Sequence, residues 1–208
     1  KLKGWWKDAS DNVEEEITFA CLSKLIVEDC SNLMTMPLFP CLEELLVLKN
    51  TSWKPLRQTI KAKKKIPRTS EFEASSSSST SSAVSPLSRL RTLCIIHMAN
   101  GEPNMWQSLP SLRSLTLDHL DDLNGLLEGL QQVTSLQELH IWRCDGLKEI
   151  PSWISSIKSL KTISIKLCPN LTIPRDRIGL ITSLKKVEIE DCPRVPHIES
   201  MLKDRFYT

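Results

Sequence analysis

The chain has 208 residues, of which 40% are hydrophobic and 25% are charged, and its formal net charge is +2. This size and composition suit one globular domain with a substantial core. The sequence contains no apolar run of about 18 residues or more, so we expect no membrane span. Seven basic residues fall in one segment, 54–68, and leave the rest of the chain net acidic, so we also expect no nucleic-acid partner.

A motif of the form Leu-x-x-Leu-x-Leu/Ile/Val recurs along the chain. Its clearest copies, 136–144, 160–168 and 184–192, lie 24 residues apart, and each ends in cysteine. The first apolar residues of the seven copies are Leu22, Leu42, Leu90, Leu112, Leu136, Leu160 and Leu184. A period of roughly 20–29 residues is typical of leucine-rich repeats. We therefore predict one α/β domain over 1–208, a horseshoe-shaped solenoid with a concave parallel β-sheet and short convex helices or helical turns.

The start of the chain does not contain a complete repeat. The phrase at 2–6, LKGWW, matches the second half of later copies at 33–37 and 147–151. We therefore expect a truncated first half-repeat at 1–18, and hence a chain that begins inside a longer solenoid.

The segment 52–86 interrupts the repeats. It begins with a basic stretch at 54–68 and continues into a serine-rich run at 74–85. This composition predicts a disordered insertion, because it offers little apolar surface to bury. The basic run at 61–68 fits either a nuclear-localisation signal or a solubilising loop, and we favour the loop.

The segments between the later motifs have helical spacing of apolar residues. Examples are 123–135 and 151–159, which we expect to form the convex helical turns. At the end of the chain, Ile198, Leu202 and Phe206 are spaced four apart. This spacing predicts a C-terminal cap over 197–208.

The cysteines follow the repeat. Cys144, Cys168 and Cys192 stand at the same place in successive copies, so we expect a buried ladder of small side chains. Adjacent strands are close enough for a disulfide, but reduced structural thiols are the interpretation we favour.

No motif indicates catalysis. His97 and His119 share one place in neighbouring repeats, but no zinc-ligand spacing accompanies them. The sequence also lacks a recognisable nucleophile motif. We therefore predict a binding protein without catalytic residues, a metal site or a cofactor in this chain.

Residues that alternate with the core leucines are expected on the concave face, because successive strand residues point to opposite sides of a sheet. Early in the chain they predict an apolar patch formed by Ile26, Leu46, Leu48, Cys94 and Ile96. Exposed apolar surface of this kind marks either an interface or a surface covered by another segment, here the insertion or preceding repeats. Both interpretations stay open on the sequence alone.

Farther along, the same positions predict an aromatic and charged cluster. Trp142 stands with His140, Arg143 and Lys166, and the acidic residues Glu138, Glu188 and Glu190 flank them. Trp and Arg are enriched at binding hot spots. We therefore predict that this cluster and the apolar patch bind a protein partner.

Four phrases carry a resemblance to a known family: 21–37, 39–48, 134–174 and 181–195. Their Leu-x-x-Leu-x-Ile-x-x-Cys rhythm, followed by Leu and Pro, resembles the leucine-rich-repeat domain of plant intracellular nucleotide-binding disease resistance proteins of the coiled-coil type. The resemblance implies a cytoplasmic, and additionally nuclear, recognition and autoregulatory domain. Such a domain senses a pathogen effector or a guarded host protein and contacts a nucleotide-binding module.

The chain itself has no Gly-x-x-x-x-Gly-Lys-Ser/Thr loop, so a nucleotide would bind only an upstream module. Two other functions remain compatible with the repeats. One is a substrate adaptor of a ubiquitin ligase, and the other is a horseshoe-type enzyme inhibitor.

Overall fold

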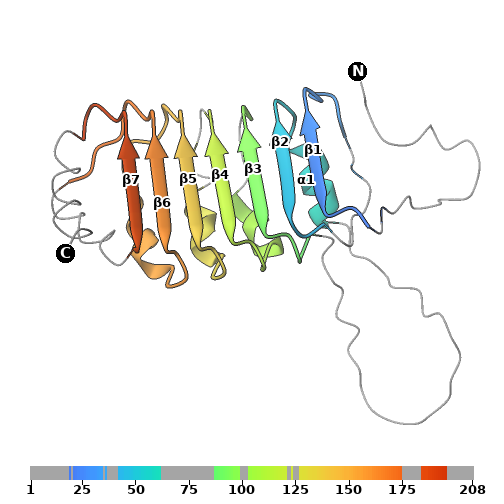
Figure 1. The fold of residues 1–208 in the computed structure, drawn as a ribbon. Coiled ribbons are helices and arrows are strands. Elements are labelled where there is room, and N and C mark those ends of the chain that lie inside the picture. The colour runs from blue at the N-terminus through green and yellow to red at the C-terminus, as the bar shows by residue number, and fades with distance from the viewer. Residues whose placement is uncertain are drawn as a thin grey trace, which may run out of the picture.

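The structure is a computed structural model that describes residues 19, 21–34, 36, 42–61, 87–98, 103–120, 123, 127–174 and 184–195. Seven parallel strands form one open sheet in sequence order, with short helices on one side of it (Figure 1). The strands are β1 Lys24–Glu28, β2 Leu45–Lys49, β3 Thr92–Ile96, β4 Ser114–Asp118, β5 Glu138–Trp142, β6 Thr162–Lys166 and β7 Lys186–Glu190. The helices are α1 Lys54–Lys61 and the 3₁₀ turns η1 Pro103–Ser108, η2 Gly129–Gln132 and η3 Ser152–Ser156. The predicted leucine-rich-repeat solenoid is confirmed.

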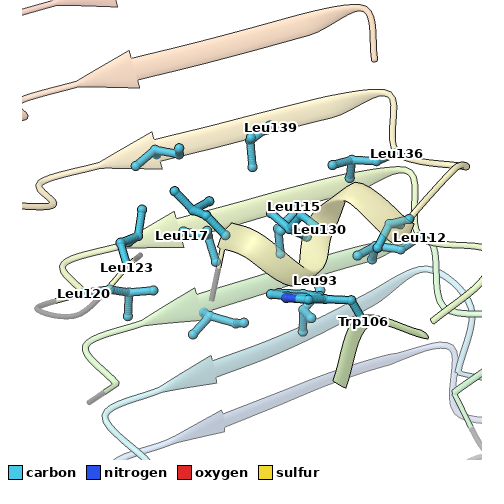
Figure 2. Close-up of a cluster of buried hydrophobic side chains, with 14 of the residues drawn as sticks. Leu93, Trp106, Leu112, Leu115, Leu117, Leu120, Leu123, Leu130, Leu136 and Leu139 are labelled. Atoms are coloured by element: carbon cyan, nitrogen blue, oxygen red, sulfur yellow. The ribbon is translucent and has the colours of Figure 1, made fainter. Parts of the chain in front are cut away.

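The core lies between the sheet and the helical turns. In β3 and β5 the motif leucines and isoleucines alternate with exposed or half-buried residues, as strand geometry requires. Figure 2 shows Leu115, Leu117 and Leu139 pointing from the strands toward Leu130 of η2. Trp106 of η1 is 1% exposed and packs into the same layer (Figure 2). Each repeat therefore buries its apolar side against its neighbours, which is the source of solenoid stability.

The predicted convex turns are confirmed where the structure describes them. Residues 152–156 form η3, which buries Ile154 in its centre. Serine hydroxyls tie the turns to the preceding repeat, because Ser135 and Ser159 donate hydrogen bonds to the carbonyls of Leu112 and Leu136 at 2.7 and 2.6 Å.

The chain leaves every strand through a residue with a left-handed backbone. The φ angles lie between 47° and 57° at Asp29, Asn50, His97, His119, Arg143, Leu167 and Asp191. Asn, Asp and His tolerate this region better than most residues, which accounts for five of the seven. The next residue in the last three repeats is a cysteine, so the turn aims the thiol back under the sheet.

The predicted cysteine ladder is confirmed. Cys144, Cys168 and Cys192 are buried free thiols. Each donates a hydrogen bond to the carbonyl two residues earlier, at 3.1 Å for Cys144 and 3.4 Å for the other two. Burial raises the pKa of Cys144 to about 11, because the thiolate is poorly solvated there. The Cys144 thiol therefore fills its turn as a small, neutral side chain.

The predicted register of the second repeat is wrong by one residue. Leu25 of β1 pairs with Leu46, and Val27 pairs with Leu48. Leu46 and Leu48 are consequently core residues, at 0% and 1% exposure, and do not line the exposed face as expected. The physical reason is an extra residue between Leu42 and the strand, and a one-residue shift exchanges the two faces of a strand.

The predicted insertion also begins too early. Residues 54–61 form the helix α1, and Trp53 and Leu56 beside and within it are buried in the core. Ile60 packs against the same core, so the apolar positions 53, 56 and 60 follow helical spacing. Thr59 donates a hydrogen bond to the carbonyl of Pro55 at 2.9 Å. The prediction failed here because it relied on the many basic residues of this segment and overlooked the narrow apolar stripe of the short helix.

Several predictions fall on residues outside the described ones. These are the half-repeat at 1–18, most of the insertion, at 62–86, and the cap at 197–208.

Candidate interaction surface

One face of the sheet points away from the helical turns, and we call it the sheet face. It presents three rows of side chains that run across the strands. The first row is Lys24, Leu45, Thr92, Ser114, Glu138, Thr162 and Lys186. The middle row is Ile26, Val47, Cys94, Thr116, His140, Ser164 and Glu188. The third row is Glu28, Lys49, Ile96, Asp118, Trp142, Lys166 and Glu190. Apolar residues gather at the β1 end, and charged residues dominate the β7 end.

The apolar cluster at the β1 end consists of Ile26, Leu45, Val47, Cys94 and Ile96. Ile26 pairs with Val47, and Val47 pairs with Cys94, so the three form a continuous apolar line across β1 to β3. Ile26 is 64% exposed, the highest value among the exposed large hydrophobic residues that the structure describes. The register shift therefore changed the members of the predicted patch, replacing Leu46 and Leu48 by Leu45 and Val47, but kept its place.

Ion pairs border this cluster. Lys24 and Glu44 are 2.8 Å apart, and Lys49 contacts Glu28 in the third row. The hydrogen bond and charge of Glu44 raise the pKa of Lys24, and the same contact lowers the pKa of Glu44. Burial raises the pKa of the Cys94 thiol, so this cysteine behaves as an apolar member of the cluster.

The second cluster lies on β5 to β7 and consists of Glu138, His140, Trp142, Lys166, Glu188 and Glu190. We call it the tryptophan cluster. The indole of Trp142 leans on the His140 ring, with ring centroids 5.7 Å apart and planes tilted by 56°. Its Nε1–H points at the hydroxyl of the buried Ser164, at 3.5 Å. The indole is held from two sides while one part of it stays accessible.

Charged groups of alternating sign lie on β6 and β7, the two strands that follow the indole across the sheet. The Lys166 ammonium lies 2.9 Å from Glu190 and 3.8 Å from Glu188. Glu188 also pairs with Lys186 at 2.5 Å. The hydrogen bond that Lys166 donates to Glu190 raises the pKa of Lys166, and the one that Glu188 accepts from Lys186 lowers the pKa of Glu188. Both shifts favour the charged forms of Lys166 and Glu188, and this charge pattern can steer a partner of complementary pattern.

His140 occupies the middle of the cluster. Its Nε2 is 3.8 Å from the Glu138 carboxylate, which also accepts a hydrogen bond from Ser114 at 3.1 Å. Its Nδ1 is buried and, among the described residues, has no hydrogen-bond partner. The ring therefore serves mainly as an apolar support for Trp142.

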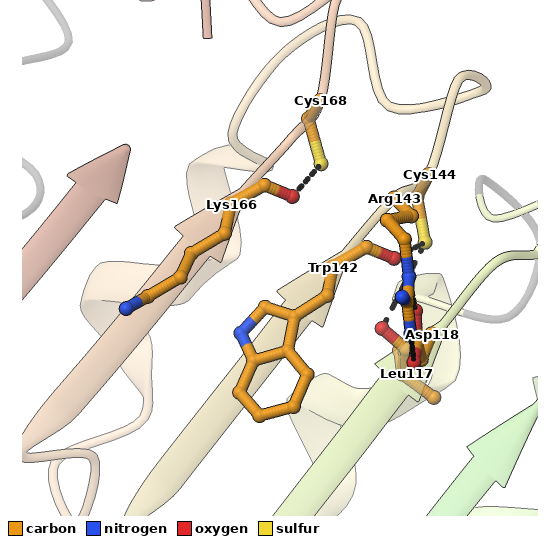
Figure 3. Close-up of polar contacts among 7 residues, drawn as sticks. All are labelled: Leu117, Asp118, Trp142, Arg143, Cys144, Lys166 and Cys168. Atoms are coloured by element: carbon orange, nitrogen blue, oxygen red, sulfur yellow. Dashed lines mark hydrogen bonds and ion pairs between the residues drawn. The ribbon is translucent and has the colours of Figure 1, made fainter. Parts of the chain in front are cut away.

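Arg143 lies at the edge of the face. It occupies the turn after β5, and its guanidinium binds Asp118 of β4 through two contacts, one of them 2.8 Å between Nε and Oδ1 (Figure 3). Asp118 is 3% exposed, so Arg143 neutralises a buried carboxylate. Figure 3 shows Trp142 and Lys166 projecting together from the sheet, whereas Arg143 folds toward Asp118. The sequence analysis placed Arg143 beside Trp142 but did not identify Asp118 as its partner. The pairing of Asp118 with Trp142 in the neighbouring strand is the feature that could have indicated it.

The two histidines at the turns after β3 and β4 form a stacked pair. The rings of His97 and His119 stack with centroids 3.8 Å apart. No group of three or more His, Cys, Asp or Glu side chains in the described part of the chain is arranged to hold a metal ion. Among the same residues, no helix is long and apolar enough to cross a membrane.

Comparison with protein-family models places part of the chain in a repeat family. Residues 119–192 match the protein family described as R13L1/DRL21 LRRs, where LRR denotes leucine-rich repeats. The match covers β5, β6 and β7 and therefore the whole tryptophan cluster. A search of curated proteins finds no match to the chain. The fold and the family match together identify a leucine-rich-repeat solenoid, a class of domain that generally binds proteins and is generally not catalytic.

Proposed function

We propose that this chain is the recognition and autoregulatory domain of an intracellular plant immune receptor. In this proposal the sheet face binds a pathogen effector or a guarded host protein, and the domain contacts a nucleotide-binding module of the same receptor. The match of residues 119–192 to a resistance-type repeat family supports the class of protein. The cytoplasm, with the nucleus as a second location, is the compartment in which such a receptor would act.

The observation that carries the binding site is that Trp142 is half-buried, with part of its ring accessible and the rest supported. A large aromatic ring held by His140 and Ser164 is ordered before binding, so little conformational entropy is lost when a partner covers it. The charges of Lys166 and Glu190 beside it provide a polar rim. An aromatic residue inside a polar rim is the usual anatomy of a hot spot.

An interaction screen with three forms of the chain tests this proposal. The forms are the unaltered chain, Trp142→Ala, and Met34→Ala as a matched control, because Met34 is an exposed apolar residue away from the tryptophan cluster. We expect Trp142→Ala to lose partners that Met34→Ala retains, among them a resistance-type nucleotide-binding module or an effector. If both variants keep every partner, the tryptophan cluster is not the binding site. If the only partners are ubiquitin-ligase subunits, the receptor role is wrong.

A further inference from the structure

The edge of the sheet where the strands begin carries a cleft that the proposed function does not use. It has a volume of about 340 Å³ and is lined by Glu43, Arg89, Arg91, Ser111, Arg113 and Ser135, among other residues. These residues come from four neighbouring repeats, the second to the fifth. Its lining residues precede β2 to β5, whose strands begin at the lower edge of the sheet in Figure 1.

The backbone fixes how close the arginines lie. The N–H of Arg91 donates to the carbonyl of Glu43 at 2.7 Å, and the N–H of Arg113 donates to the carbonyl of Arg91 at 2.8 Å. Adjacent strands are about 4.8 Å apart, so Arg91 and Arg113 begin side by side. Two like charges at this spacing destabilise the edge unless an anion lies between them.

The carboxylate of Glu43 only partly offsets the positive charge of these arginines. Its carboxylate is 2.5 Å from Arg89 and 3.7 Å from Arg91. Among the described residues, no carboxylate lies within ion-pair distance of Arg113. Three guanidinium groups therefore face one carboxylate, and the cleft keeps an excess of positive charge. The side chains of Arg89 and Arg91 are 61% and 52% exposed, so a ligand can reach them from solvent.

The donors suit one compact anion with several oxygens. Guanidinium groups form paired, parallel hydrogen bonds to phosphate and carboxylate, and a phosphate monoester offers three acceptor oxygens and nearly two negative charges. A nucleic acid fits poorly, because Glu43 would repel a continuous phosphate backbone and no described lining residue offers an aromatic ring for stacking.

We propose that this cleft binds a phosphoserine or phosphothreonine side chain of a partner protein. Arg113 and Arg91 form the hydrogen bonds to the phosphate, while Arg89 and Glu43 hold Arg91 in place. The site is separate from the tryptophan cluster, so it adds a phosphorylation-dependent contact to whatever the sheet face binds. Its test does not depend on the immune-receptor role.

Fluorescence anisotropy of the purified chain with a labelled glycine/alanine peptide that contains one phosphoserine tests the site. The comparison peptides carry serine or glutamate at the same position. We expect saturable binding of the phosphopeptide, weaker by at least about tenfold for Arg113→Gln. Lys185→Gln is the matched control. Lys185 occupies the same edge two repeats beyond the cleft, and this substitution removes one positive charge, as Arg113→Gln does. This control and Trp142→Ala should bind as the unaltered chain does.

Four outcomes overturn the proposal. Equal weakening by Arg113→Gln and Lys185→Gln shows unspecific attraction, and equal binding of the glutamate peptide shows a carboxylate site. Inorganic phosphate that displaces the phosphopeptide at a concentration equal to that of the peptide shows a free-anion site. An oligothymidylate that binds more tightly than the phosphopeptide shows a nucleic-acid surface. Circular dichroism checks that Arg113→Gln folds, and Arg91→Gln provides a second variant of the same cleft if it does not.

Discussion

The guanidinium of Arg143, in the turn after β5, closes over the buried carboxylate of Asp118 in the neighbouring strand β4. The pair joins two successive repeats at the end of their strands. A buried carboxylate without a partner is strongly unfavourable, because it loses its hydration and gains nothing in return. Arg143 is therefore a structural residue first, although its position beside Trp142 also gives it access to a partner.

This relationship predicts how two variants combine. Arg143→Met should lower the denaturation midpoint, because it leaves the buried side chain of Asp118 without its partner. Adding Asp118→Asn should recover most of the loss, since the amide needs no counter-charge. Urea denaturation of the two single variants and the double variant measures the coupling. Simple additivity of the two single effects would mean that the pair does not stabilise the fold.

The register of β2 predicts a contrast between neighbouring leucines. Leu46→Ala should reduce the free energy of unfolding by about 2–5 kcal/mol, because it opens a cavity in the core. Val47→Ala, one residue along on the sheet face, should cost well under that range. Both follow from the pairing of Leu25 with Leu46. Chemical denaturation distinguishes them, and the reverse order of effects would favour the register in which Leu45 and Val47 face the core.

Burial of Cys144 predicts a stability change at alkaline pH. Its pKa is about 11 in the folded chain against an ordinary value of 9.0, so the unfolded chain releases the proton first as pH rises. The stability is therefore complete below about pH 9 and should fall by roughly 2–3 kcal/mol toward pH 11 from this group alone. Cys144→Ala should show a correspondingly shallower decline. Equal slopes for the two proteins in urea denaturation across this range would show that the thiol ionises freely in the folded state.

Much of the fold was predictable because the same sequence motif occurs seven times. Leucines at fixed spacing determined the strands, and cysteines at one place determined the ladder. The second repeat was the exception, since its strand reads LLVLK and apolar residues occupy both faces. When alternation is absent, periodicity cannot choose a register, and the extra residue before the strand decided it.

The surface was less predictable, for two reasons. The Arg143–Asp118 pair required the exact offset between strands, which the sequence does not give for a residue in a turn. The arginine cleft had a visible signal, because Arg91, Arg113, Lys161 and Lys185 stand in a single row at the N-terminal edge of the sheet. The overall acidity of the repeats, taken as an average, concealed this local row.

The central claim is that the sheet face recognises a protein through Trp142. Isothermal titration of a partner from the interaction screen into the unaltered chain, Trp142→Ala and Met34→Ala tests it most directly, with circular dichroism confirming equal folding. The account predicts that Trp142→Ala weakens binding by about 2 kcal/mol or more while Met34→Ala binds normally. Unchanged affinity of Trp142→Ala, with the fold intact, would contradict it.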